Sequence, residues 1–180
     1  NIMGFMNIME CCRKYRVERL IYASSSSVYG ANNKIPFNVN DKVDKPISIY
    51  ATSKIANELM SHTYNHLFKI KTIGLRFFTV YGPWGRPDMA YYIFCDKINK
   101  GEPIDIFNNG NLKRDFTYID DIVNGTKSAM DSNYECEVFN LGNNKSENIM
   151  DIIRLIEKNI GKNAIINYKD LEPGDIEQTY

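Results

Sequence analysis

The chain has 180 residues, of which 43% are hydrophobic and 12% aromatic, a composition typical of a globular protein with a buried core. Its 22 basic and 22 acidic residues balance, so no charge excess indicates binding to nucleic acid or to an anionic membrane. No run approaches the ~18 apolar residues of a membrane span. The four cysteines lack a metal-type C-x-x-C spacing, which favours reduced thiols in a cytoplasmic protein.

Helical and strand patterns alternate along the first half of the chain. Residues 2–15 carry a helical stripe of apolar side chains, and residues 19–23 form a short apolar strand that runs into four serines. Residues 31–48 are polar and indicate a surface loop. A long helix over 49–68 and a strand over 73–78 follow.

The alternation continues in the second half. The Gly-Pro-Trp-Gly-Arg-Pro run at 82–87 predicts an ordered loop, because neither glycine nor proline favours regular structure. A helix over 90–100, a strand over 104–107 and a helix over 120–130 come next. The last expected elements are a strand over 138–141 and a helix over 148–160. This order predicts an α/β fold with a largely parallel sheet.

The first motif with chemical meaning is Tyr-Ala-Thr-Ser-Lys at 50–54. Residues four apart lie on one face of a helix, so the ammonium of Lys54 is expected beside the phenol of Tyr50. A free phenol titrates near ~10, and a neighbouring cation favours its deprotonated form. The pair can therefore supply a general base, although this spacing also arises by chance.

The second motif is Ser-Ser-Ser-Ser-Val-Tyr-Gly at 24–30, after the strand over 19–23. Ligands of open parallel sheets bind at the carboxyl ends of the strands. A hydroxyl there can bond a substrate oxygen and share a proton with Tyr50. Taken alone, the serines would indicate only a turn.

These two motifs, with Leu-Arg-Phe-Phe at 75–78, resemble the extended short-chain dehydrogenase/reductase family. The segments at 82–90, 101–104 and 114–123 resemble its UDP-glucuronate 4-epimerase branch in particular. The likeness extends over essentially the whole chain, and the 82–90 loop is its most specific part.

The resemblance implies a Rossmann domain that holds NAD and a smaller α/β domain that clasps the nucleotide sugar. The fold class expected is therefore the C-terminal part of a Rossmann-type doubly wound parallel sheet plus a small α/β substrate domain. Residues 1–82, with 115–142 returning to them, correspond to the first part. Residues 83–180 correspond mainly to the second.

The resemblance also assigns roles to single residues. Tyr50 is implied as the catalytic base, Lys54 as the residue that binds the cofactor ribose and tunes Tyr50, and Ser25 as the catalytic hydroxyl. The remaining assignments are Ala23 and Phe78 to the cofactor, Ser26 and Thr79 to the sugar, Phe107 to the uracil, Arg114 to the diphosphate and Asp175 to the uridine ribose.

The chain departs from the family pattern in one large respect, since it contains no Gly-x-x-Gly-x-x-Gly fingerprint. That motif places the pyrophosphate at a helix N-terminus. We expect about a hundred residues to precede Asn1 and a shorter tail to follow Tyr180. On its own, the chain is expected to be inactive. A smaller departure is Glu172, where the branch tends to have Gln.

The implied reaction is NAD-dependent inversion at C4 of a UDP-sugar, with UDP-glucuronate expected as the substrate and UDP-galacturonate as the product. Related dehydratases and decarboxylases place acidic residues where this chain has Ser26 and Ser27, which favours epimerisation. A positively charged group suited to the C6 carboxylate is Arg86, which could instead brace its loop or contact the cofactor. The alternatives are another UDP-hexose 4-epimerase, a dehydratase or decarboxylase, and a truncated fragment that only binds UDP-sugar.

Two further patterns are interpreted as structural. His62 and His66 have the spacing of zinc ligands, but the catalytic Glu of that motif is replaced by Thr63, so no metal site is expected. Asp120 and Asp121 are expected to supply the N-cap and the first-turn negative charge of the helix over 120–130. The partners expected are a UDP-sugar and a second copy of the chain, joined through the helices over 2–15 and 49–68.

Overall fold

The computed structural model describes residues 1–171 and 178–180. The chain divides into two compact units. Unit 1 consists of Asn1–Phe78 and Asp120–Leu141, and unit 2 consists of Thr79–Ile119 and Gly142–Tyr180. Unit 1 is therefore built from two separate stretches of chain.

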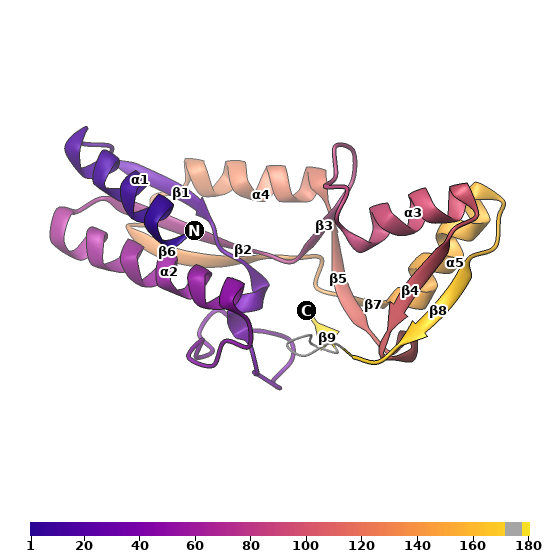
Figure 1. Ribbon diagram of the computed structural model, residues 1–180. Coiled ribbons are helices and arrows are strands. Elements are labelled where there is room, and N and C mark those ends of the chain that lie inside the picture. Colours follow the sequence, from indigo (N-terminus) through magenta and orange to yellow (C-terminus); the bar gives the residue numbers. More distant parts are fainter. Residues whose placement is uncertain (172–177) are drawn as a thin grey trace. The chain divides into compact units, whose positions relative to one another are not determined.

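Unit 1 contains a three-stranded parallel sheet in the order β1-β2-β6. Its helices α1 and α2 lie on one face of this sheet, and α4 lies on the other (Figure 1). The elements are α1 (Ile2–Lys14), β1 (Arg19–Ala23), the 3₁₀ turn η1 (Ser26–Tyr29), α2 (Ile49–Phe68), β2 (Lys71–Phe77), α4 (Ile119–Asp131) and β6 (Cys136–Leu141).

The central strand β2 presents different side chains to the two faces, as strand geometry requires. Ile73 and Leu75 are buried and pack in one apolar cluster with Ala129 of α4. On the other face Gly74 leaves room for Tyr22, because a Cβ at residue 74 would lie 2.6 Å from the Tyr22 hydroxyl oxygen. One of the two charged residues of β2, Arg76, is buried, with 3% of its surface exposed.

Local signals determine where α2 begins and ends. The side chain of Ser48 accepts a hydrogen bond from the backbone N–H of Ala51, which satisfies one of the unpaired donors of the first turn. Lys69 adopts a left-handed conformation with φ 58° and ends the helix. Tyr50 therefore lies in the first turn of α2, and Lys54 lies one turn further along.

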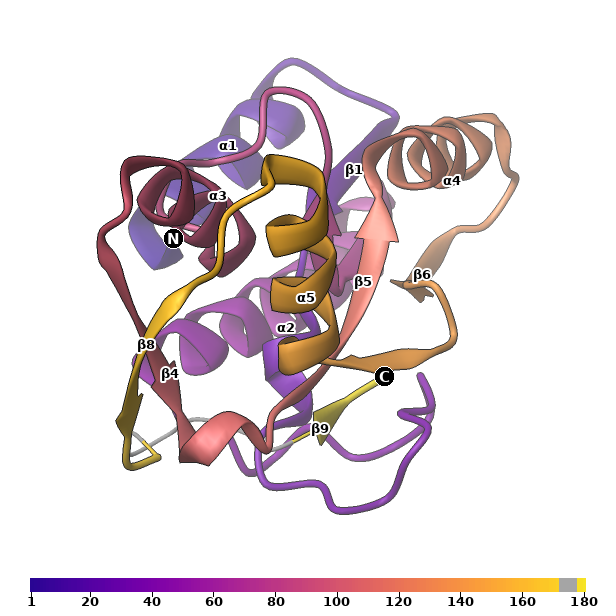
Figure 2. The ribbon, with the colours of Figure 1, turned by 90° about the vertical axis from the view of Figure 1, so that its right-hand side faces the viewer.

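In its described residues, unit 2 holds two small sheets and two α-helices. Strand β4 pairs in parallel with β8, as Figure 2 shows, and helices α3 and α5 pack with β4 around a core that includes Phe94, Ile104 and Ile153. Strand β5 pairs with β3, β7 and β9. The elements are β3 (Thr79–Tyr81), α3 (Ala90–Lys100), β4 (Pro103–Phe107), η2 (Asn108–Gly110), β5 (Lys113–Tyr118), β7 (Ser146–Asn148), α5 (Ile149–Ile160), β8 (Ile165–Lys169) and β9 (Gln178–Thr179).

The expected α/β class with a parallel sheet is confirmed, and the expected helices are present within one or two residues of their bounds. The sequence patterns did not indicate β3, β5, β7, β8 and β9. The expected first part ran to residue 82 and resumed at 115, whereas unit 1 ends at Phe78 and resumes at Asp120. The difference arises because β3 pairs with β5, so both strands belong to unit 2.

Candidate active site

The first two turns of α2 bring Tyr50 and Lys54 together in unit 1. The ammonium nitrogen of Lys54 lies 5.7 Å from the centre of the Tyr50 ring and donates a hydrogen bond of 2.9 Å to the carbonyl oxygen of Ala23. Burial lowers the pKa of Lys54 below its ordinary value. Half of the Tyr50 side chain is exposed, so its hydroxyl is accessible to a ligand.

The serine segment, residues 24–30, follows β1 in the same unit. The Ser25 hydroxyl oxygen caps η1 and accepts hydrogen bonds from the backbone N–H of Ser27, at 3.2 Å, and from the Ser27 hydroxyl, at 2.9 Å. A hydroxyl has one proton to donate besides its two acceptor positions, so Ser25 can still donate to a substrate oxygen. Ser26 is the first residue of η1 and is half-buried.

Phe78 packs into the interior of unit 1. Its side chain is 9% exposed and forms a cluster with Val28, Tyr29 and Phe37. Its backbone N–H donates to the carbonyl oxygen of Leu141 at 3.1 Å, just beyond the last residues of β2 and β6. Phe78 therefore packs against the serine segment through its contacts with Val28 and Tyr29.

A buried polar network lies next to these residues and was missed by the sequence reasoning. Arg76 forms a bidentate ion pair with Glu58, with N···O distances of 2.9 and 2.8 Å, and also donates a hydrogen bond of 3.0 Å to the hydroxyl oxygen of Tyr29. The hydroxyl of Ser24 donates to Glu58 at 2.5 Å. The sequence did carry one signal for this network, because Arg76 is the single charged residue in the apolar run at 73–78 and a buried charge requires a partner.

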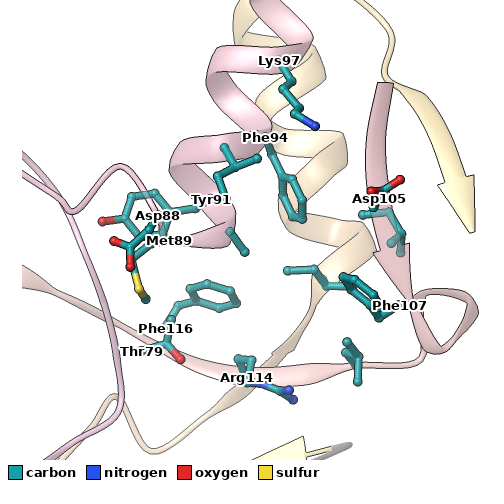
Figure 3. Close-up of a pocket in the computed structure, with 15 residues that line it drawn as sticks. Thr79, Asp88, Met89, Tyr91, Phe94, Lys97, Asp105, Phe107, Arg114 and Phe116 are labelled. Carbon is teal, nitrogen blue, oxygen red and sulfur yellow. The ribbon is translucent and has the colours of Figure 1, made fainter. Parts of the chain in front are cut away.

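Unit 2 contains a cavity of about 460 Å³. Three residues expected to bind substrate line it, namely Thr79, Phe107 and Arg114. In Figure 3, β4 and β5 supply Phe107 and Arg114, while α3 contributes Phe94 and Lys97. Apolar walls with a few cationic groups suit a ligand that carries an aromatic base and a negatively charged group.

Arg86 lies on the loop between β3 and α3 and is exposed. Its guanidinium forms an ion pair with the carboxylate of Asp88, which lines the same cavity. The Arg86 side chain lowers the pKa of Asp88 through this hydrogen bond. Arg86 is thus already bound to a carboxylate of the chain itself.

The remaining sequence expectations have simpler outcomes. Asp175 and Glu172 lie outside the described residues. His62 and His66 are both exposed on α2. Asp120 and Asp121 lie in the first turn of α4, which begins one residue earlier than expected, so Asp120 is not its cap.

Within residues 1–171 and 178–180, no three His, Cys, Asp or Glu side chains are grouped so that they could bind a metal ion. None of the helices described is both long enough and apolar enough to cross a membrane.

Comparison with known proteins gives consistent matches. The sequence model of the NAD dependent epimerase/dehydratase family matches residues 1–142. CapI from Staphylococcus aureus is 50% identical to the chain, over 100% of the chain and 59% of that protein. UDP-glucuronate 4-epimerase 4 from Arabidopsis thaliana is 45% identical, over 100% of the chain and 45% of its own length. The chain thus spans about half the length of these curated relatives.

A solved structure matches as well. The crystal structure of UDP-glucuronic acid 4-epimerase from Bacillus cereus, in complex with UDP-glucuronic acid and NAD, superposes with a TM-score of 0.92 at 37% sequence identity. The match covers 99% of the chain and 57% of the Bacillus protein.

Proposed function

The chain belongs to the NAD dependent epimerase/dehydratase family, and from that premise we propose that the full-length protein epimerises a UDP-sugar at C4 with the help of NAD. The observation that carries the proposal is the arrangement of Tyr50, Lys54 and Ala23 at the carboxyl end of β1. A general base, a cation and a hydroxyl donor then lie within one small region of unit 1. The names of the relatives support the same reaction.

The residues present fit a nicotinamide cofactor. Lys54 uses one of its three N–H donors on the Ala23 carbonyl, and the other two can reach the hydroxyls of a ribose. The site lies at the carboxyl end of parallel strands, where dinucleotides bind in open α/β sheets. A bound NAD would supply reversible hydride transfer at C4 of the sugar.

Residues of the chain accept and return the proton of the sugar 4-hydroxyl. Tyr50 takes the proton of the sugar 4-hydroxyl, either directly or through the hydroxyl of Ser25. Lys54 stabilises negative charge beside the Tyr50 ring. Ser27 donates two hydrogen bonds to the Ser25 oxygen, one from its backbone N–H and one from its hydroxyl, and these bonds orient the Ser25 side chain. After the 4-keto sugar rotates, Tyr50 returns the proton.

The nucleotide end of the substrate is assigned to unit 2. Phe107 stacks on the uracil, Arg114 meets the diphosphate, and Thr79 faces the sugar, as the family resemblance implies. The cavity that these three residues line supports the assignment. The proposed contact of Asp175 with the uridine ribose rests on the resemblance alone.

The preferred sugar is UDP-glucuronate, which is converted to UDP-galacturonate. The names of the Arabidopsis and Bacillus relatives, both UDP-glucuronate 4-epimerases, support this choice. Ser26 and Ser27 support it as well, because the 4-keto uronate is a β-keto acid and needs a pocket without a proton source near C5. Arg86 receives the C6 carboxylate by exchanging Asp88 for the substrate.

Steady-state kinetics of the full-length protein on UDP-glucuronate and UDP-glucose tests the proposal. We expect kcat/KM to favour the uronate by roughly a hundredfold, the scale of a charged hydrogen-bond pair. Arg86→Leu should shrink that ratio, and Lys113→Leu, an exposed cation of β5, should leave it unchanged. Equal use of both sugars by the wild type would remove the uronate assignment but leave a UDP-sugar 4-epimerase. No epimerisation of either sugar would contradict the function as a whole.

A homodimer through α1 and α2 is the second part of the proposal. The exposed apolar residues Met3 and Met6 of α1, and Leu59 and Leu67 of α2, support it, since large apolar side chains on packed helices favour association. Light scattering of Leu59→Glu should show a shift from dimer to monomer. A wild-type protein that is monomeric at micromolar concentration would contradict this part alone.

A further inference from the structure

We propose that Glu58 and Arg76 are positioning residues that hold the serine segment in register with the catalytic end of α2. The inference rests on the proposed function, because the register matters for proton transfer between Ser25, Tyr50 and the sugar. Neither residue is assigned a contact with substrate or cofactor. Their role is exerted through the hydrogen bonds that they make inside unit 1.

The pair itself has a fixed geometry. Two nitrogens of the Arg76 guanidinium, Nε and Nη2, donate to the two carboxylate oxygens of Glu58 at 2.9 and 2.8 Å. The Arg76 and Glu58 side chains are only 3% and 9% exposed. Burial alone would lower the pKa of Arg76, but the hydrogen-bonded carboxylate of Glu58 raises it above its ordinary value. The guanidinium and the carboxylate are both planar and are joined by two parallel hydrogen bonds, so neither group can shift without the other.

Both ends of the serine segment are attached to this pair. The hydroxyl of Ser24, at the start of the segment, donates to Oε1 of Glu58 at 2.5 Å. The hydroxyl oxygen of Tyr29, near its end, accepts from Nη1 of Arg76 at 3.0 Å. The Tyr29 hydroxyl in turn donates to the side-chain oxygen of Asn140 at 2.6 Å. Ser25 lies between the two attachment points.

The same pair is attached to the catalytic helix. Glu58 lies one turn beyond Lys54 and two turns beyond Tyr50 on α2. Lys54 bonds to the carbonyl oxygen of Ala23, and Glu58 bonds to the hydroxyl of Ser24. Two consecutive residues of the chain are therefore attached to two consecutive turns of the helix, which prevents the serine segment from sliding along it.

Stability alone does not account for this arrangement. Replacing a buried ion pair by apolar residues of similar volume is often neutral or stabilising, so burial of two charges is a poor way to hold a core together. What an apolar pair cannot supply is a set of directional bonds that end on Ser24 and Tyr29. A role in positioning explains why the pair bonds to both Ser24 and Tyr29 of the serine segment, in addition to the bond from Arg76 to the carbonyl oxygen of Val39.

The first test is Ser24→Ala in the full-length protein, which removes only the bond between the serine segment and Glu58. We expect kcat to fall on the order of tenfold, because small displacements of reacting groups are costly, with KM changed less than about twofold. Ser61→Ala is the matched control, since Ser61 is also a buried serine and lies on α2 outside this network. A wild-type kcat in Ser24→Ala would overturn the inference.

The second test removes both charges together, in the double variant Glu58→Leu and Arg76→Met. No unpaired buried charge remains, so the fold is expected to persist, as circular dichroism would show. We expect kcat to fall roughly 10- to 100-fold. A folded double variant with wild-type kcat would refute the positioning role. If the double variant fails to fold, the result for Ser24→Ala decides.

A third measurement does not depend on activity. Hydrogen exchange of the Ser27 and Val28 amides, which donate to the Ser25 side chain and backbone, should be faster in Ser24→Ala than in Ser61→Ala. Unchanged exchange would contradict the inference even in an active enzyme. A wild-type protein that epimerises no UDP-sugar would overturn the proposed function instead, and the exchange result would still decide whether the pair positions the segment.

Discussion

The two units each contain an arginine paired with a carboxylate, and the two pairs lie in opposite environments. In unit 1 the Arg76 and Glu58 side chains are 3% and 9% exposed, whereas in unit 2 those of Arg86 and Asp88 are 75% and 63% exposed. A buried pair cannot lose one partner without leaving an uncompensated charge, while an exposed pair can exchange its partner for water. The comparison teaches that the pair attached to the serine segment is fixed in place, whereas the pair on the 82–90 loop can be opened by a ligand.

The largest effect is expected from Glu58→Ala, which leaves Arg76 buried without its carboxylate. The free energy of unfolding should fall by about 3–5 kcal/mol, the usual cost of breaking a buried pair. Urea denaturation followed by circular dichroism measures it. A loss below about 1 kcal/mol would mean that water reaches Arg76 and that the contrast between the two units is weaker than their exposure indicates.

Tyr50→Phe should affect chemistry without affecting the fold. We expect kcat of the full-length protein to fall at least roughly a hundredfold, the lower end of a general-base contribution, because the phenol is the proton acceptor. Binding of UDP should persist, as calorimetry can show, since the nucleotide is assigned to unit 2. Near-wild-type turnover would refute the catalytic assignment of Tyr50.

Arg114→Met probes the cavity of unit 2 and, unlike Tyr50→Phe, should change KM more than kcat. We expect KM for the UDP-sugar to rise roughly tenfold or more, the scale of a hydrogen bond to a charged group, with kcat changed much less. The neighbouring Lys113→Met serves as the control, because Lys113 is exposed on the same strand and does not line the cavity. A fall in kcat with an unchanged KM would place Arg114 in the chemistry rather than in binding.

The smallest effect is expected from Asp88→Ala, the counterpart of Glu58→Ala. Because its ion pair with Arg86 is exposed, the free energy of unfolding should change by less than about 1 kcal/mol. The same urea titration measures both variants under identical conditions. A loss as large as that in Glu58→Ala would show that the 82–90 loop depends on this pair for its structure.

The helices were predictable because their signals are local. Ser48 caps α2 within three residues, and the apolar spacing of α1 and α5 is visible in short windows. The strand β5 was missed because residues 113–118 contain two cations and an aspartate. Asp115 is buried there, and the Thr117 hydroxyl and the backbone N–H of Asn143 donate hydrogen bonds to it.

The contacts of the candidate site also divide into local ones, which the sequence predicts, and long-range ones, which it does not. The spacing of Tyr50 and Lys54 follows from helix geometry, so their proximity could be predicted. The bond that Lys54 donates to Ala23 and the bonds that Ser24 and Arg76 donate to Glu58 could not be predicted, because they join residues 18 to 34 positions apart. Such contacts depend on how α2 packs on the sheet, which no short window of sequence specifies.

The discontinuity of unit 1 has a consequence for synthesis on the ribosome. Strand β2 lies in the middle of its sheet, and its partner β6 is made only after residues 78–135 have been added. At ~5–20 residues per second, several seconds pass in which β2 has an unpaired edge that includes Ile73 and Leu75. Nascent chains are therefore expected to need protection by a chaperone during that interval, and slower translation of the intervening stretch should increase aggregation.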